Sequence, residues 1–238
     1  MAQFSLTLGF VPGATPAKWS RTWAERHPDT TLTLRAVTAA DAPAEVRAGT
    51  VDVALLRLPA DTSALAVIQL YEEIIVAVMP VDHLLSAADE ISAADLDGEP
   101  ILLPLDDVVT WADAPGTPTD HRPETTRAAM ELVAAGMGVL IVPQSLARLY
   151  HRRDLTYRPI TDGPTCPVAL AFREGSQSAL IEEFTGIVRG RTPGSSRGQS
   201  QQPAPKRTAR EKALAKQAAR AAAGKVIRRP VPKTRRRG

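Results

Sequence analysis

The basic residues of this 238-residue chain are concentrated toward its C-terminus, and this divides the chain into two dissimilar parts. Of the 29 Lys and Arg residues, 15 lie in residues 191–238 beside one acid, Glu211, which gives a net charge of +14. Residues 1–190 contain the other 14 and 25 Asp and Glu, a net charge of −11. The basic segment has no apolar stripe wide enough to pack, so it is predicted to be a flexible, partly helical tail. A folded domain is therefore expected within residues 1–190.

Segments with the apolar pattern of strands alternate with segments of helical periodicity through residues 4–189. The predicted strands are residues 4–10, 31–37, 51–58, 73–79, 100–103, 139–142, 155–160 and 167–172. Predicted helices follow the caps Thr15 and Asp41, and the second of these helices is expected to end at Gly49. Others cover residues 93–96, after a capping pair of Ser92 and Asp95, and residues 123–135, 145–150 and 176–189. This alternation predicts an α/β domain with a mostly parallel sheet and helices on both faces. In such sheets ligands bind beyond the carboxyl ends of the strands.

Composition and spacing argue against several classes of protein. The single cysteine, Cys166, excludes an intramolecular disulfide framework and a multi-cysteine metal site. No basic residue precedes Lys18, so a secretion signal is not predicted, and no apolar run is long enough to cross a bilayer. The chain is therefore expected to be cytoplasmic, with no membrane contact and no cofactor.

Catalytic patterns are also missing. The four histidines are dispersed, and none belongs to a zinc-binding pattern: His27, His83, His121 and His151. Ser145 lacks the glycines of a nucleophile elbow, and no base is evident for Cys166, which is expected to be a small apolar side chain. Asp120 and His121 are adjacent, but adjacency in a loop is common by chance. The chain is predicted not to be an enzyme.

Five segments, in order and with consistent spacing, resemble the effector-binding domain of LysR-type transcriptional regulators. They are the strand and helix that end in Arg26-His27-Pro28-Asp29, RAGTVDVALL at residues 47–56, LYEE at 70–73 with PVDH at 80–83, ISAADLDGEP at 91–100, and LVAAGMGVLIVPQS at 132–145. The resemblance covers roughly residues 4–188.

The resemblance implies a two-lobed fold of the periplasmic-binding-protein type (type 2), followed here by the basic tail. The first lobe would comprise residues 1–79 and 162–190, and the second residues 80–161, with two crossover strands between them. A small effector would bind in the cleft. The family also carries an N-terminal helix-turn-helix and a linker helix, and because the resemblance begins at residue 4 these are expected to be missing.

Several candidate ligand contacts follow from this fold. Gly13, Ala14 and Thr15 open a helix, where backbone N–H groups could receive a carboxylate; the alternative is a plain helix cap. Arg57, at the end of a buried strand, could bind an anionic effector; the alternatives are a salt bridge to an acid of the other lobe, or exposure. Thr38 and Ala39 form a turn that lines the cleft in the family.

The second lobe adds candidates at its own edge of the cleft. Leu105 and Asp106 follow a short strand, and Asp106 or Asp107 could bind a cationic group, although a helix-capping role is the stronger alternative. Thr125, near a helix start, and Pro143 with Gln144, after a strand, are further candidates, with cap and turn as their alternatives.

The tail is expected to contact nucleic-acid phosphates with little sequence preference. The cations concerned are Lys206, Arg207, Arg210, Lys212, Lys216, Arg220, Lys225, Arg228, Arg229, Lys233, Arg235, Arg236 and Arg237. The alternatives are a solvated tail, one lying on the acidic body, or self-association. The sequence thus predicts a small-molecule sensor in transcriptional regulation, acting as a homodimer or beside another regulator. The alternative function is a ligand-binding or interaction module that partners a regulator without binding DNA.

Overall fold

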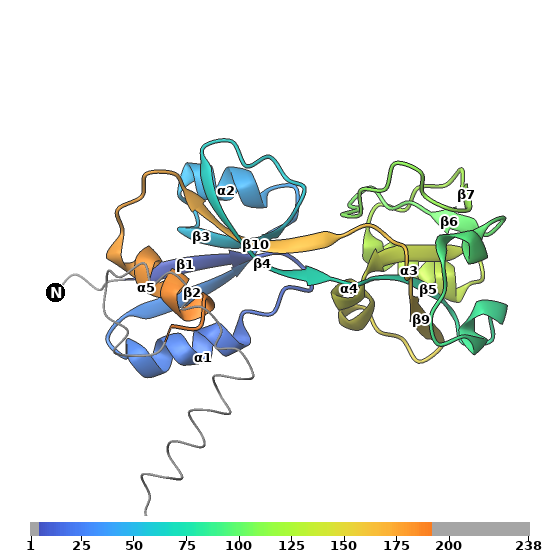
Figure 1. Ribbon diagram of the computed structural model, residues 1–238, viewed down its shortest axis with the longest axis horizontal. Coiled ribbons are helices and arrows are strands. Elements are labelled where there is room, and N and C mark those ends of the chain that lie inside the picture. Colours follow the sequence, from blue (N-terminus) through green and yellow to red (C-terminus); the bar gives the residue numbers. More distant parts are fainter. Residues whose placement is uncertain (1–4, 192–238) are drawn as a thin grey trace, which may run out of the picture. The chain divides into compact units, whose positions relative to one another are not determined.

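The structure is a computed structural model and describes residues 5–191. Its strands form two five-stranded sheets (Figure 1). The first has the order β2-β1-β3-β10-β4. Its strands are β1 (Ser5–Phe10), β2 (Thr31–Ala36), β3 (Val53–Arg57), β4 (Leu65–Glu73) and β10 (Cys166–Arg173). β3 is buried along its whole length, and its sequence, apolar up to Arg57, is typical of a central strand covered on both faces.

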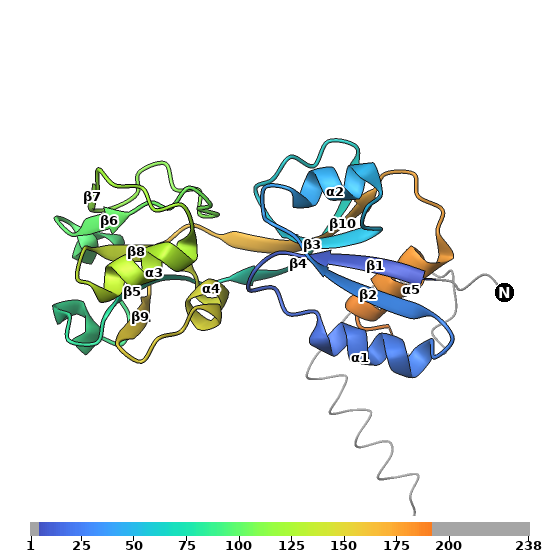
Figure 2. The ribbon, with the colours of Figure 1, turned by 180° about the vertical axis from the view of Figure 1, so that it is seen from behind.

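Three helices cover the first sheet, and with it they form the first lobe. They are α1 (Ala17–Arg26), α2 (Ala42–Ala48) and α5 (Ala179–Val188). α1 and α5 pack together on one face, and α2 lies on the other, against β3 and β10 (Figures 1 and 2). Trp23 of α1 and Phe184 of α5 are both buried, with ring centroids 5.8 Å apart, and anchor one side of the core.

The second sheet has the order β7-β6-β8-β5-β9 and forms the second lobe. Its strands are β5 (Ile75–Pro80), β6 (Pro100–Leu102), β7 (Thr117–Pro118), β8 (Val139–Pro143) and β9 (Leu155–Pro159). Its helices are α3 (Thr126–Ala134), α4 (Gln144–Leu149) and the short 3-10 turns η1 (Leu84–Ala87) and η2 (Ala93–Leu96). α3 and α4 pack on the buried strands β5 and β8. Separate apolar clusters fill the two faces of this sheet.

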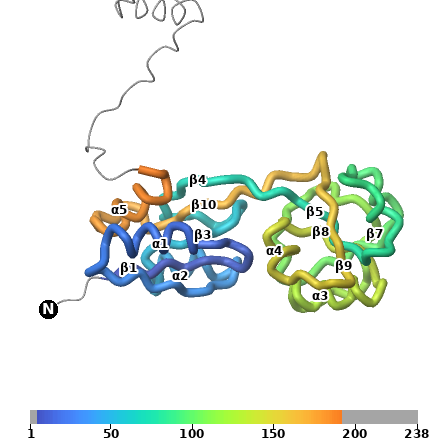
Figure 3. The backbone as a smooth tube through the Cα atoms, turned by 90° about the horizontal axis from the view of Figure 1, so that it is seen from below, coloured from blue at the N-terminus to red at the C-terminus, as the bar shows by residue number. Residues whose placement is uncertain are grey.

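The chain passes between the lobes twice. β4 leads into β5 through Ile74, and the segment after β9 returns to β10. β4 and β10 pair antiparallel over nearly their whole length, with one irregularity between Val168 and Ala169, and Figure 3 shows them side by side. The first sheet therefore ends at Glu73, several residues before the boundary expected at residue 79, because β5 pairs with β8 and β9 of the second sheet.

The prediction of a mostly parallel sheet is wrong. β1 pairs parallel with β2 and β3, and β6 with β7 and β8, but β10 and β5 each make two antiparallel pairings. The reason is the crossover: a strand that returns from the other lobe enters its sheet from the opposite end. β4 was also missed, because as a long edge strand with Gln69 and Glu72 exposed it lacks a buried apolar run.

Local capping signals were partly right. The pairing of Ser92 with Asp95 is confirmed, since the Asp95 carboxylate accepts hydrogen bonds from the Ser92 backbone N–H and hydroxyl, each at 2.7 Å. Gly49 ends α2 in the left-handed conformation, φ 74°, as predicted. Thr15 does not cap α1: Pro16 occupies the cap position, without a side-chain hydrogen bond. No helix within residues 5–191 is long and apolar enough to cross a membrane.

Two glycines near the α3–β8 turn provide a test of this packing. Gly138 has φ 151°, and a Cβ there would lie 2.4 Å from the backbone oxygen of Pro100, whereas a Cβ on Gly136, φ 73°, would meet nothing within 4 Å. Gly138→Ala is expected to lower the free energy of unfolding by about 2–4 kcal/mol, because rigid backbone must shift. Gly136→Ala, the control, should cost about 1–2 kcal/mol from backbone strain alone. Urea unfolding of both full-length variants measures this, and equal costs would contradict the close approach.

Candidate functional site: the cleft between the lobes

A cavity of about 790 Å³ is bordered by both lobes and by the first crossover. Its volume lies in the range of small-molecule sites. The lining residues are Phe10, Pro12, Gly13, Ala14, Thr15, Ala36, Tyr71, Glu72, Glu73, Ile74, Gln144, Ser145, Arg148, Leu149 and Tyr150. Four of the predicted contacts therefore lie together on it: Gly13, Ala14, Thr15 and Gln144.

The β1–α1 loop reaches the second lobe because residue 13 has no side chain. Gly13 adopts φ 83°, and a Cβ on it would lie 2.7 Å from Ser145 Oγ and 2.9 Å from Arg57 Nη2. Only glycine accommodates both the conformation and the contact. Ala14 is buried beside it and Thr15 is exposed to the cavity, so the loop presents backbone and a hydroxyl group toward α4.

Arg57 lies directly behind this loop and is already paired. Its side chain is 3% exposed, and its Nε donates to Glu73 Oε2 at 2.6 Å. Its Nη2 donates to Ser145 Oγ at 2.9 Å, so one guanidinium joins β3, the end of β4 and the start of α4. The partner acid lies on the crossover strand rather than in the second lobe. The buried pair is electrically neutral, and Arg57 itself does not line the cavity.

Gln144 and Pro143 stand at the exit of β8. The Gln144 backbone N–H donates to Ile74 O at 2.9 Å, which holds the start of α4 against the crossover. Gln144 lines the cavity, whereas Pro143, buried at the end of β8, does not.

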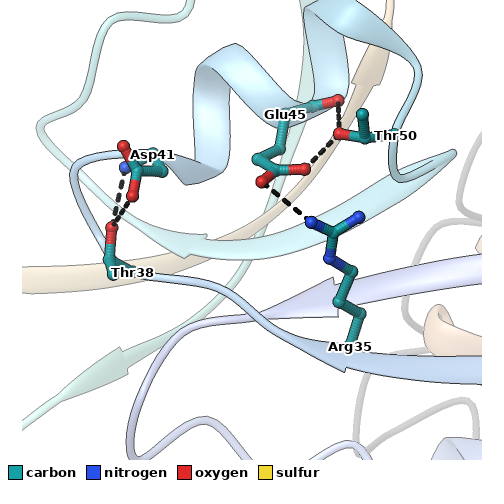
Figure 4. Close-up of polar contacts among 5 residues, drawn as sticks. All are labelled: Arg35, Thr38, Asp41, Glu45 and Thr50. Carbon is teal, nitrogen blue, oxygen red and sulfur yellow. Dashed lines mark hydrogen bonds and ion pairs between the residues drawn. The ribbon is translucent and has the colours of Figure 1, made fainter.

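The remaining predicted contacts are not brought to the cavity, and polar groups nearby engage most of them. Thr38 Oγ1 donates to Asp41 Oδ2 at 2.7 Å and accepts from the Asp41 backbone N–H at 3.0 Å, next to the ion pair of Arg35 with Glu45 (Figure 4). Ala39, beside Thr38, is partly buried against the first-lobe core. Neither residue borders the cavity.

In the second lobe the capping role prevails. Asp106 Oδ1 accepts from the Thr126 backbone N–H at 2.5 Å and from its hydroxyl at 2.8 Å, at the start of α3. Thr125 is the N-cap of the same helix and accepts from the Ala128 backbone N–H at 3.1 Å. Leu105 is 62% exposed. All three lie away from the described cavity.

Sequence reasoning missed the cavity residues that come from the crossover and from α4. Tyr71, Glu72 and Glu73 end the strand that was not predicted, and the LYEE motif to which they belong indicated only the family resemblance. Arg148 lies in α4 and Tyr150 caps the end of that helix, whose place in the fold could not be inferred from its short sequence. The available signal was the pair of acids immediately before an apolar strand, at a point where the chain changes sheets.

The described residues offer little support for a nucleophilic thiol or a metal site. Burial raises the pKa of the Cys166 thiol to about 11, with a further contribution from Glu73 on the adjacent strand. Such a thiol is almost entirely protonated near neutral pH and is a poor nucleophile. Within residues 5–191, no group of three or more His, Cys, Asp and Glu side chains is arranged to hold a metal ion. The predicted phosphate-contacting cations of the tail lie outside the described residues.

The buried ion pair gives a stability prediction. Arg57→Met should lower the free energy of unfolding by about 3–5 kcal/mol, because it leaves the Glu73 carboxylate buried without its partner. The double variant Arg57→Met/Glu73→Met should recover most of that loss. Arg35→Met, which breaks an exposed pair, is the control and should cost less than about 1 kcal/mol. Denaturant unfolding of the wild-type chain and the three variants measures these losses, and equal losses for Arg57→Met and Arg35→Met would contradict the prediction.

Comparison with known proteins gives a consistent result. The model of the LysR substrate binding domain matches residues 5–193. The chain is 29% identical over 201 residues to the Hca operon transcriptional activator HcaR of Escherichia coli K12, covering 78% of this chain and 67% of that protein. It is 30% identical over 154 residues to the regulator CatR of Pseudomonas putida, covering 60% of this chain and 53% of that one. The chain thus spans about half to two thirds of the length of these relatives.

Solved structures show the same fold. The effector-binding domain of BenM, solved with its effector benzoate, superposes with a TM-score of 0.67 at 20% identity, covering 82% of this chain and 97% of that chain. The oxidised form of OxyR gives 0.64 at 22% identity, covering 78% and 92%. The predicted two-lobed fold of the periplasmic-binding-protein type is confirmed by these likenesses and by the two sheets. The chain belongs to the LysR substrate-binding domain family.

Proposed function

We propose that this chain is a non-enzymatic sensor that binds a small organic effector in the cleft and acts in transcriptional regulation. The observation that carries the proposal is the cavity of about 790 Å³, whose lining comes from the β1–α1 loop, the crossover and α4. A ligand placed there contacts both lobes at once. The curated relatives named above are transcriptional regulators, which supports the regulatory context.

The contacts around the cavity indicate how binding would be transmitted. Arg57 bonds Ser145 across the lobes, and the Gly13 loop fits against both. The two lobes can adopt arrangements in which the Gly13 loop and Ser145 lie closer together or farther apart. A ligand in the adjacent cavity binds some of these arrangements more tightly than others. It therefore shifts the population toward the arrangement that it binds more tightly, by an amount set by the difference in affinity.

Thiol oxidation is not the signal that we propose. Some relatives are described as probable hydrogen peroxide-inducible genes activators, such as that of Mycobacterium avium, 30% identical over 199 residues. This sequence contains one cysteine, so it cannot form an intramolecular disulfide, and Cys166 is buried with a raised pKa. The cleft provides the alternative of reversible ligand binding.

A cavity-filling substitution tests the site. Thr15 lines the cavity and is exposed, so Thr15→Tyr should fill part of the space at little cost to folding. A panel of small aromatic and aliphatic acids, amines and amino acids, beginning with benzoate, is screened by thermal shift on the full chain. The compound that binds should lose about tenfold or more in affinity in Thr15→Tyr, because the side chain occupies its volume. Thr33→Tyr, on the exposed edge strand β2, is the control. Unchanged binding in Thr15→Tyr would place the ligand elsewhere.

We also propose that the basic segment contacts nucleic acid without sequence specificity. Its support is the charge of residues 191–238, +14 beside a body of −11. Several phosphate contacts by such a segment would release counterions, which makes affinity fall steeply with salt.

DNA binding by the full chain and by a chain ending after residue 193 tests this proposal. The shorter protein retains the compact unit of residues 1–193. The full chain should bind duplexes of unrelated sequence, and its affinity should fall by ~10³-fold or more between about 50 and 200 mM salt. The shorter protein should not bind. Equal binding by both proteins would contradict the proposal, and binding by neither would favour a module that partners another regulator.

A further inference from the structure

The cavity contains an acidic and a basic side chain that are not neutralised within residues 5–191. Of its charged residues, Glu73 is paired with the buried Arg57. Glu72 has a contact only with the neutral amide of Gln69, at 3.4 Å, and Arg148 Nε donates to the neutral phenol of Tyr157 at 3.3 Å. Neither Glu72 nor Arg148 takes part in an ion pair in the described part of the chain. The cavity thus offers one unpaired charge of each sign.

The two charges enter the cavity from different elements. Glu72 lies on β4 of the crossover, and Arg148 lies on α4 of the second lobe. The same cavity is also lined by large apolar and aromatic side chains, which are Phe10, Pro12, Tyr71, Ile74, Leu149 and Tyr150. Ile74 and Leu149 are 54% and 52% exposed, so apolar surface is left uncovered beside the charges. An apolar ligand body would remove that surface from water.

A ligand with one charge does not match this arrangement. A carboxylate on Arg148 would leave Glu72 unpaired in the same cavity, and an amine on Glu72 would leave Arg148 unpaired. Arg57 does not offer a second anion site, because its Nε and Nη2 already bind Glu73 and Ser145 behind the cavity lining. A ligand that carries both groups replaces water at each charge with a charge-assisted hydrogen bond.

We infer that the cleft binds a zwitterion: an amino-acid-like ligand with an aromatic or bulky apolar side chain. Its carboxylate is bound by Arg148, its ammonium group by Glu72, and its side chain by the Tyr71, Ile74 and Leu149 surface. This inference rests on the proposed function of the cleft and adds the chemical class of its ligand. It keeps the carboxylate that the sequence suggested as a ligand group and adds an ammonium group.

Matched probes test the inference by isothermal titration calorimetry on the full chain. One series is L-phenylalanine, 3-phenylpropanoate, which lacks the ammonium group, and 2-phenylethylamine, which lacks the carboxylate. A second series is L-tryptophan, 3-indolepropionate and tryptamine. In at least one series the amino acid should bind about tenfold or more tightly than either analogue, because each analogue lacks one of the two charged hydrogen bonds.

Two variants assign the charges. Glu72→Gln should weaken binding of the amino acid and leave binding of the acid unchanged or stronger, so that the protein no longer prefers the amino acid over the acid. Arg148→Met should weaken binding of both the amino acid and the acid and leave binding of the amine unchanged. The exposed residues Glu90 and Arg153 lie outside the cavity lining, so Glu90→Gln and Arg153→Met are controls of matched charge.

The outcomes separate this inference from the proposed function. If an acid or an amine binds as tightly as its amino acid, or if Glu72→Gln leaves the preference unchanged, the zwitterion is wrong while ligand binding in the cleft stands. If no probe of either series binds with a Kd of about 5 mM or below, the inference is overturned. The proposed function is then judged separately by the wider panel and the Thr15→Tyr variant.

Discussion

The antiparallel pairing of β4 with β10 is the constraint on which the rest of the structure depends. These strands carry the chain out of the first sheet and back into it, and their pairing fixes the register of both passages. The end of β4 therefore lies at a defined place between the lobes. Tyr71, Glu72 and Glu73 reach the cavity because the strand ends there.

That placement assigns different roles to two adjacent acids. Successive side chains of a strand point to opposite faces, so Glu73 turns inward to Arg57 while Glu72 remains exposed. The inward acid neutralises a buried guanidinium, which without it would be costly to bury. The outward acid keeps its charge available to a ligand. One strand thus supplies a structural ion pair and, in the proposed site, a recognition group from neighbouring positions.

Sequence reasoning was most successful where a signal was local. The strands at residues 5–10, 53–57 and 139–143 and the glycine that ends α2 followed from patterns within a few residues. It failed for β4, whose apolar positions are mixed with polar ones because an edge strand pairs with one neighbour only. It also failed to predict the antiparallel strand pairs, because the direction of a strand depends on how the chain passes between the two sheets, and no single segment of the sequence contains that information.

The candidate site divides in the same way. The motif after β1 and the exit of β8 predicted that Gly13, Ala14, Thr15 and Gln144 would border a cleft, and the structure brings them together. Arg57 was predicted to be a ligand contact or a member of a salt bridge. Its partner Glu73 could be identified only from the pairing of β4 with β10. Thr38 and Asp106 have polar side chains of the kind that bind ligands, but they form hydrogen bonds with Asp41 and Thr126 instead.

By itself, the sequence determined the division into an acidic folded body and a basic segment, the α/β class, and the resemblance that names the family. These follow from composition, periodicity and short motifs, which a chain carries before it folds. Only the tertiary structure decided which charges are neutralised and which remain open. That depends on distances between Arg57, Glu73 and Ser145, residues 16 to 88 positions apart in the chain. Pairing energies are set by separation in space and by burial, and neither can be read from order along the sequence.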